Sequence, residues 1–162
     1  MKKIDSLKNY IKNDDYQVFL FVGPVPIPFS FAKHHWFVIN KKGDLSRWEV
    51  VWRQSRCKTS WGYLHKNLYP PLQGIEKFLF SDKYFWKNSF LLGVIEGDEH
   101  SPAKDMAEFI ENSPNIYPYC YQYSFIGTNS NSYAQWVLNN FPQVNFKLRW
   151  NSFGKRKAPK TT

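Results

Sequence analysis

The pattern of apolar and polar positions predicts a chain in which strands come first and helices follow. Runs rich in β-branched and aromatic residues predict a strand over residues 17–22, a hairpin over 32–53 and a buried strand over 90–96. Helical spacing of apolar residues predicts helices over 3–13, 101–113 and 129–141. This order indicates an α+β domain with a central antiparallel sheet and helices packed on it.

The segments between these elements are less regular. Residues 54–73 predict an aromatic loop, residues 75–80 fit either a helix or a strand, and the aromatic stretch 117–125 is expected to be extended. Trp36, Trp48 and Trp136 are expected in the core. No internal repeat and no long linker divides the chain, so we expect a single domain over 1–154 followed by a basic tail, 155–162.

The predicted hairpin carries two adjacent histidines. If its turn centres between Lys42 and Gly43, residue 34 faces 51 and residue 36 faces 49, which places Glu49 diagonally near His34. A carboxylate there can orient an imidazole. A one-residue slip would replace His34 by His35, and a surface charge pair between Glu49 and Arg47 or Arg53 remains the alternative.

The start of the last predicted helix is the second candidate site. Asn129-Ser130-Asn131-Ser132 opens an apolar helical face that ends before Pro142. A side chain in the first turn lies beside unpaired backbone N–H groups at the positive end of the helix dipole, which suits an anionic nucleophile or a bound oxyanion. These residue types are also the preferred caps, so capping alone is the competing interpretation.

Composition limits the other functions. The chain has 162 residues, a formal charge of +9 and 19% aromatic residues, which fits a folded, aromatic-rich domain. The basic C-terminal end could contact nucleic acid or another anion, although a solvated, frayed terminus is the favoured interpretation. Cys57 and Cys120 are too few for a zinc site, so we expect no metal and no cofactor.

The expected location of the protein in the cell depends on its N-terminal residues and on its longest apolar run. No apolar signal core follows the basic start, and residues 16–31 are too short and too proline-rich for a membrane span. We therefore expect no transmembrane segment and a cytoplasmic location, with signal-independent export left open.

With these motifs in order, the chain resembles the circularly permuted branch of the NlpC and papain-like superfamily, which includes lecithin retinol acyltransferase-like proteins. More closely, it is similar to a bacterial family with a domain of unknown function. The matching motifs lie between about residues 32 and 155: His34-His35-Trp36, Trp48-Glu49-Val50, Tyr117-Pro118-Tyr119, Asn129-Ser130-Asn131-Ser132 and Gly154-Lys155.

The resemblance implies His34 as the general base, Ser130 at the position of the usual Cys nucleophile and Glu49 as the third polar residue. Serine in place of cysteine makes the nucleophile depend more on its base. The reaction implied is hydrolysis or acyl transfer at an amide or ester bond of a peptide, a peptidoglycan fragment or a lipid.

Other residues would support that site. The Asn129 or Asn131 side chain would help to bind the oxyanion, His35 would be the alternative base, and Trp61 and His65 would wall the cleft, although a solvated loop position is the simpler expectation for His65. The alternative functions are an inactive papain-like binding module for a peptide, glycan or lipid, and a basic nucleic-acid-binding protein.

Overall fold

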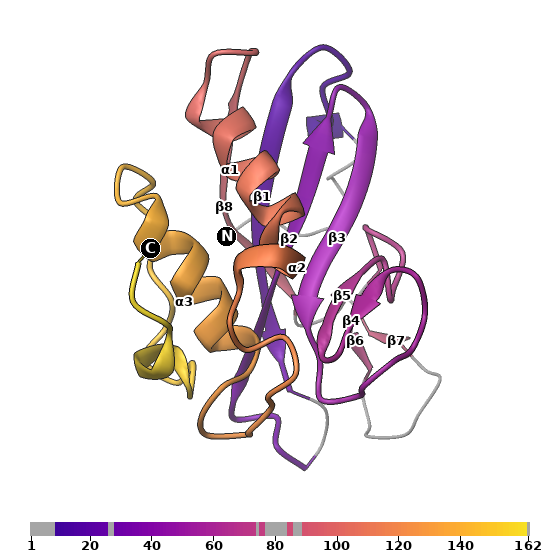
Figure 1. Cartoon of the computed structure of the whole chain (residues 1–162). Helices are drawn as coiled ribbons and strands as arrows, with labels where there is room; N and C mark the ends of the chain where they lie inside the picture. Colours follow the sequence, from indigo (N-terminus) through magenta and orange to yellow (C-terminus); the bar gives the residue numbers. More distant parts are fainter. Residues whose placement is uncertain (1–8, 26–27, 74, 77–83, 86–88, 162) are drawn as a thin grey trace.

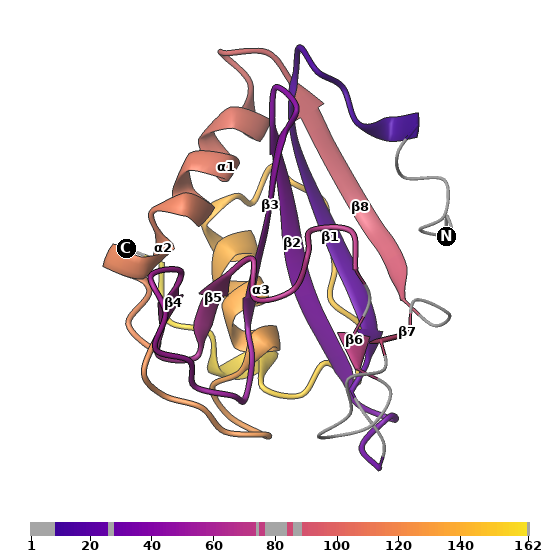
Figure 2. The same cartoon turned by 90° about the vertical axis from the view of Figure 1, so that its right-hand side faces the viewer.

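The protein is an α+β domain built on one six-stranded antiparallel sheet, as predicted. The computed structural model describes residues 9–25, 28–73, 75–76, 84–85 and 89–161. The sheet order is β4-β5-β3-β2-β1-β8, and the helices cover one of its faces (Figures 1 and 2).

The predicted hairpin is present with its predicted register. Strands β2 (Lys33–Lys41) and β3 (Asp44–Val50) pair with Phe37 opposite Trp48, the register in which 34 faces 51 and 36 faces 49. The two-residue turn sets this register, because Lys42 and Gly43 both have positive φ, 53° and 95°, as a tight hairpin requires.

The first strand lies inside the sheet and the last strand lies at its edge. Strand β1 (Tyr16–Pro24) contains the predicted strand 17–22 and pairs with β2 on one side. Strand β8 (Phe90–Gly97) pairs with β1 on the other side, with a shift in register after Leu20. The strand prediction for 90–96 is confirmed, but its full burial is wrong, because an edge strand keeps one side open to solvent.

The predicted loop 54–73 contains a small hairpin that extends the sheet. Strands β4 (Ser60–Trp61) and β5 (Leu64–Lys66) pair with each other, and β5 pairs with β3. In the ambiguous segment, β6 (Ile75–Glu76) pairs with β7 (Tyr84–Phe85) as a separate two-stranded sheet, whereas 77–80 lie outside the described residues.

The helices follow the predicted start and stop signals. Helix α1 (Pro102–Glu111) is capped by Ser101, and the short α2 (Ser113–Ile116) follows it. Helix α3 (Ser130–Asn140) is capped by Asn129. The N-terminal helix prediction falls mostly outside the described residues, and residues 9–13 contain only a 3-10 turn and bends.

The two faces of the sheet have different partners. The face toward the helices packs against α1 and α3, and the core between them includes Phe37 and Trp48 from the sheet and Trp136 from α3. The opposite face contains a smaller cluster around Phe21, Trp36 and Val38. All three tryptophans expected in the core are buried, with exposed fractions of 2% or less.

Two segments differ from their predictions. Residues 118–121 form turns, so the extended conformation expected for 117–125 is wrong there. The basic end is ordered on the domain: η2 (Lys155–Lys157) follows Gly154, Lys155 donates to the carbonyls of Leu148 and Arg149, and Ala158 packs against the core.

Candidate functional site

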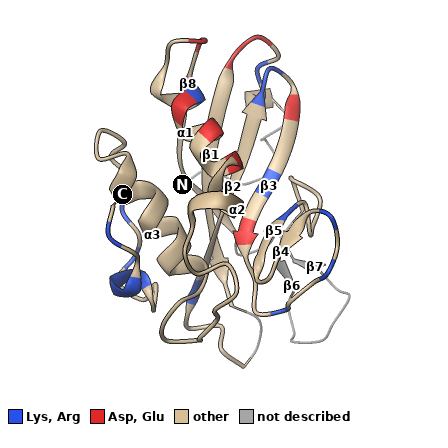
Figure 3. Cartoon of the chain, viewed as in Figure 1, with Lys and Arg blue, Asp and Glu red and all other residues tan. Residues whose placement is uncertain are grey.

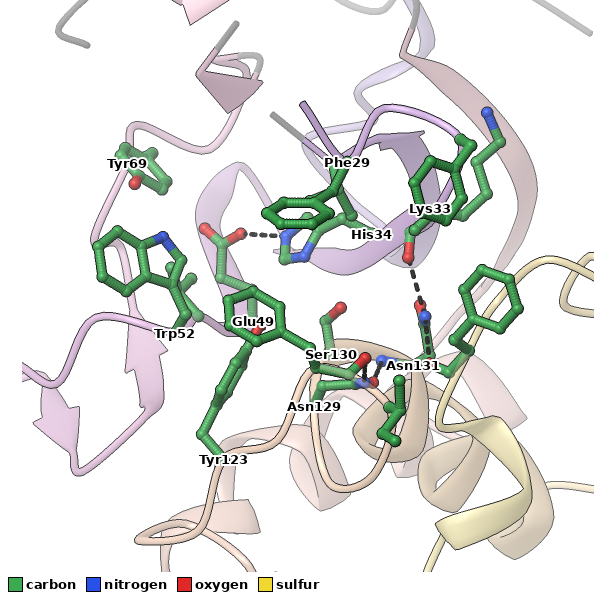
Figure 4. A pocket seen from close by; sticks show the side chains of 17 residues that line it. Phe29, Lys33, His34, Glu49, Trp52, Tyr69, Tyr123, Asn129, Ser130 and Asn131 are labelled. Atoms are coloured by element: carbon green, nitrogen blue, oxygen red, sulfur yellow. Dashed lines mark hydrogen bonds and ion pairs between the residues drawn. The ribbon is translucent and has the colours of Figure 1, made fainter. Parts of the chain in front are cut away.

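A cavity of about 310 Å³ opens where the start of β2, the residues after β3 and the N-terminus of α3 meet (Figure 4). Its lining is largely apolar, and its ionisable members among the described residues are few: Lys33, His34, Glu49 and two tyrosines, Tyr69 and Tyr123. The apolar part of the wall includes Phe29, Phe31, Val51, Trp52, Phe125 and Ile126. Such a lining suits an apolar group with one polar end.

The predicted contact between the hairpin histidine and glutamate is confirmed. Nε2 of His34 lies 2.8 Å from Oε2 of Glu49 (Figure 4). A carboxylate only accepts, so this contact places a proton on Nε2. Nδ1 of His34 has no protein partner in the part of the chain that the structure describes, and in the neutral ring it is the nitrogen that carries the lone pair.

Glu49 belongs to a buried charge cluster rather than to a surface pair. Arg47, also fully buried, places Nε 2.6 Å from Oε1 and donates from Nη2 to Oε2 at 2.9 Å. The guanidinium also lies over the Trp36 ring, 4.6 Å from its centroid, and His34 stacks on the same indole. Burial works against the ionised carboxylate, but the Arg47 charge and the His34 contact outweigh it and hold the pKa of Glu49 down to about 2.

Ser130 opens the first turn of α3 and lines the same cavity. Its neighbours' N–H groups are occupied, because Oδ1 of Asn129 accepts from the backbones of Asn131 at 2.9 Å and Ser132 at 3.4 Å. The carbonyl of Asn129 accepts from the Tyr133 N–H. Within the described residues the Ser130 N–H has no protein acceptor, which leaves one helix-terminal donor beside its own hydroxyl.

The structure thus brings Ser130, His34 and Glu49 to one cavity, but it does not bond the serine to the histidine. No hydrogen bond joins the Ser130 hydroxyl to His34 among the residues described. The reason lies in strand alternation: His34 shares its face of β2 with Trp36, whereas α3 packs on the Phe37 face. Both residues nevertheless line one cavity, because both lie at the same end of the sheet (Figure 4).

The two candidate asparagines are not free to bind an oxyanion. Nδ2 of Asn129 donates to the carbonyls of Ser124 and Phe125. Nδ2 of Asn131 donates to the carbonyls of Lys33 and Phe153 at 2.8 and 2.7 Å. Both amides therefore hold loops in place, and the prediction that they supply oxyanion donors does not fit their bonds.

His35 is locked into the core beneath the site. Since both Asn131 amide hydrogens are used, its Oδ1 must face His35, whose Nδ1 lies 2.7 Å away and therefore carries the proton. Burial lowers the pKa of His35 to about 3, although the Asn131 bond favours its charged form. His35 is fully buried and does not line the cavity, so His34 is the imidazole that a bound molecule would meet.

The two residues expected to wall the cleft lie elsewhere. Trp61 stacks on Trp48, and His65 is fully buried, which contradicts its expected solvated position. His65 bonds the Ser60 hydroxyl through Nδ1 at 2.8 Å and the Arg53 carbonyl through Nε2 at 2.9 Å. Neither residue lines the cavity. From that aromatic segment it is Tyr69 that does so.

Several lining residues were not singled out from the sequence. Phe29 and Phe31 follow the prolines after β1, and Phe125 and Ile126 precede the Asn-Ser motif. The sequence signal that could have found them is the presence of apolar residues in loop-like segments next to the candidate catalytic residues. Lys33, whose pKa is lowered by burial and then by the charge of Arg149, comes directly before His34.

The described part of the chain lacks two other kinds of feature. It contains no group of three or more His, Cys, Asp or Glu side chains that could hold a metal ion. It also contains no helix that is long and apolar enough to cross a membrane.

Comparison with protein families places the sheet and the site within a known family model. Residues 15–156 match the model of a family described as Protein of unknown function (DUF3750). The chain belongs to the DUF3750 family. The match spans the whole sheet, the cavity and α3, so the site described above lies within the DUF3750 region. No curated protein and no solved structure matches the chain.

Proposed function

We propose that this DUF3750 protein is a hydrolase or acyltransferase that acts on an ester or amide bond of a substrate with an apolar acyl group. One observation carries the proposal: Ser130, whose N–H has no protein acceptor among the described residues, lines the same apolar cavity as a histidine held by a buried glutamate (Figure 4). The apolar lining favours an acyl chain over a polar glycan or a charged peptide.

In this reaction the Ser130 oxygen attacks the carbonyl carbon while Nδ1 of His34 takes the hydroxyl proton. The tetrahedral oxyanion is stabilised by the Ser130 N–H at the positive end of α3. Collapse of this intermediate breaks the bond to the leaving alcohol or amine, which receives the proton from His34. Water or an acceptor alcohol then releases the acyl group by the reverse sequence.

Glu49 acts through the imidazole. Its bond to Nε2 selects the tautomer with a free Nδ1 and stabilises the charged ring that forms during attack. The serine must approach His34 by a side-chain rotation, since the two are not bonded in the resting structure; such bonds often form only in the substrate complex.

The order of the elements supports a permuted papain-like frame for this chemistry. The histidine strand comes first, the strand with the third polar residue follows it, and the nucleophile helix comes last. This is the order of the superfamily that the sequence resembles, with Ser130 replacing cysteine.

The test is hydrolysis of chromogenic acyl esters of increasing chain length. We expect Ser130→Ala and His34→Gln each to lower kcat/KM by at least about a hundredfold, the usual contribution of an acid–base group. Ser55→Ala, which changes a partly buried serine outside the cavity, should leave the rate unchanged. Equal rates for the protein and Ser130→Ala would contradict the proposal.

A second candidate is a binding module without chemistry, and the missing bond between Ser130 and His34 favours it. In that case the cavity would still take up a fluorescent fatty-acid analogue, with unchanged affinity in Ser130→Ala and His34→Gln. Binding without turnover across the ester series would select this function over catalysis.

A further inference from the structure

The mouth of the cavity carries an unusual share of the molecule's exposed apolar surface. Five of the eight large hydrophobic side chains that are exposed in the described residues line this cavity: Phe29, Phe31, Phe125, Ile126 and Phe153. Ile126 is 81% exposed and Phe31 is 64% exposed. Isolated exposed hydrophobics are ordinary, but a contiguous group of them marks an interaction surface.

These side chains are held at the mouth by defined contacts. Phe29 packs against Phe125 with ring centroids 5.8 Å apart, and Phe31 packs against Phe153 at 6.2 Å. The side chain of Asn151 donates to the Phe31 carbonyl at 2.8 Å, which ties the loop before β2 to the C-terminal segment. Trp150, next to it in sequence, is 84% exposed. We call the five exposed lining side chains, together with Trp150, the apolar rim.

The charges around the apolar rim have one sign. Lys33 lines the cavity, Arg149 acts on its pKa, and η2 adds Lys155–Lys157 directly after Phe153. No Asp or Glu occurs in residues 16–43, 50–75 or 112–162, which supply every residue of the rim. Among the residues whose side chains the structure describes, the acidic ones lie mostly away from the rim, apart from the buried Glu49 (Figure 3).

We propose that the apolar rim and its flanking cations dock this protein peripherally on an anionic lipid bilayer, with the cavity mouth facing the membrane. Protruding aromatic and aliphatic side chains enter the headgroup region, and lysine and arginine at the same level pair with lipid phosphates and carboxylates. The combination gives the two independent signals that stable peripheral binding needs.

The chemistry of the rim favours a bilayer over nucleic acid. Nucleic-acid grooves combine a positively charged track with aromatic faces on which bases stack. Ile126, the most exposed residue of the cavity lining, offers no such face, and the cavity it lines is apolar. Burial of these side chains gains free energy only in an apolar phase.

Vesicle co-sedimentation tests the docking. We expect binding to mixed phosphatidylcholine–phosphatidylserine vesicles at low salt, weaker binding to pure phosphatidylcholine, and a blue shift of Trp150 emission that Trp150→Phe removes. The double variant Phe31→Ser and Ile126→Ser should bind at least about tenfold more weakly, because two exposed apolar anchors are lost. Replacing Arg156 and Lys157 by Gln should weaken binding to a similar extent.

Val94→Ser is the matched control, since Val94 is an exposed apolar residue on β8 away from the cavity lining. It should bind like the unchanged protein, and so should Ser130→Ala, which separates docking from catalysis. No binding to the anionic vesicles at low salt would overturn the proposal. Loss of binding only with the charge variant, or tight binding of single-stranded DNA that the rim variants abolish, would overturn it as well.

Discussion

At the scale of single residues, the sequence predicted the contact that organises the site. Side-chain alternation and the Lys42-Gly43 turn together place Glu49 beside His34, and the structure has them 2.8 Å apart. The same reasoning could not find the bond between His35 and Asn131, because it joins residues 96 positions apart. It also missed the burial of Arg47, which turns an apparent surface pair into a buried cluster.

Glu49→Gln should destabilise the fold, because it leaves the buried Arg47 charge without its carboxylate. We expect a loss of roughly 3–5 kcal/mol in unfolding free energy near neutral pH, measured by urea denaturation. Since the folded pKa is depressed, the carboxylate's contribution is present above the unfolded value and fades as the pH falls toward about 2. The gap between variant and parent should therefore narrow in acid. Glu108→Gln, at a half-exposed pair, is the control.

His35 should make stability depend on pH in the mildly acid range. Its folded pKa of about 3 lies below the ordinary value of 6.5, so the unfolded chain binds more protons between the two and stability falls as the pH drops. This costs roughly 2 kcal/mol between about pH 7 and pH 5. His35→Gln should show a flatter pH dependence in urea titrations, whereas His100→Gln, at an exposed site, should match the parent protein. Parallel curves for His35→Gln and parent would refute this role.

At the scale of elements, local signals predicted most starts and stops but not the neighbours of each element. The caps at Ser101 and Asn129 and the turn of the hairpin follow from residue type, and the structure confirms them. The small β4–β5 hairpin was missed because its strands are only two and three residues long. Strand β8 was expected to be buried because apolar composition does not tell an edge from a centre.

Gly154 shows how one element positions the site in another. It has φ of +91°, and a Cβ there would lie 2.3 Å from the Gly127 carbonyl and 2.6 Å from Nδ2 of Asn129, the cap of α3. Gly154→Ala should therefore lower the unfolding free energy by about 1–3 kcal/mol and disturb the Ser130 turn. Gly43→Ala is the matched control, because it shares the positive φ but meets only the flexible Asn13 side chain at 3.3 Å. A smaller loss in Gly154→Ala than in Gly43→Ala, by thermal or urea unfolding, would contradict this account.

At the scale of the whole molecule, the fold class was predictable and the topology was not. The succession of strands and helices indicates an α+β domain with an antiparallel sheet, which the structure confirms. The sequence carries no signal that β8 joins the edge beside β1 or that β5 continues the sheet beside β3. The packing of α3 on β2 and β3 brings Ser130 to the cavity that His34 lines, and such contacts between residues far apart in the sequence cannot be read from single positions.

The most direct test of the account is covalent labelling of Ser130 by an alkyl fluorophosphonate, read by peptide mass spectrometry. We expect an adduct on Ser130 that forms much more slowly in His34→Gln and is absent in Ser130→Ala, because only a serine activated by a neighbouring base reacts readily. Ser132, buried in the capping box of the same helix, should stay unlabelled. If no adduct forms on Ser130, or if it forms equally fast without His34, the proposed serine–histidine site is wrong.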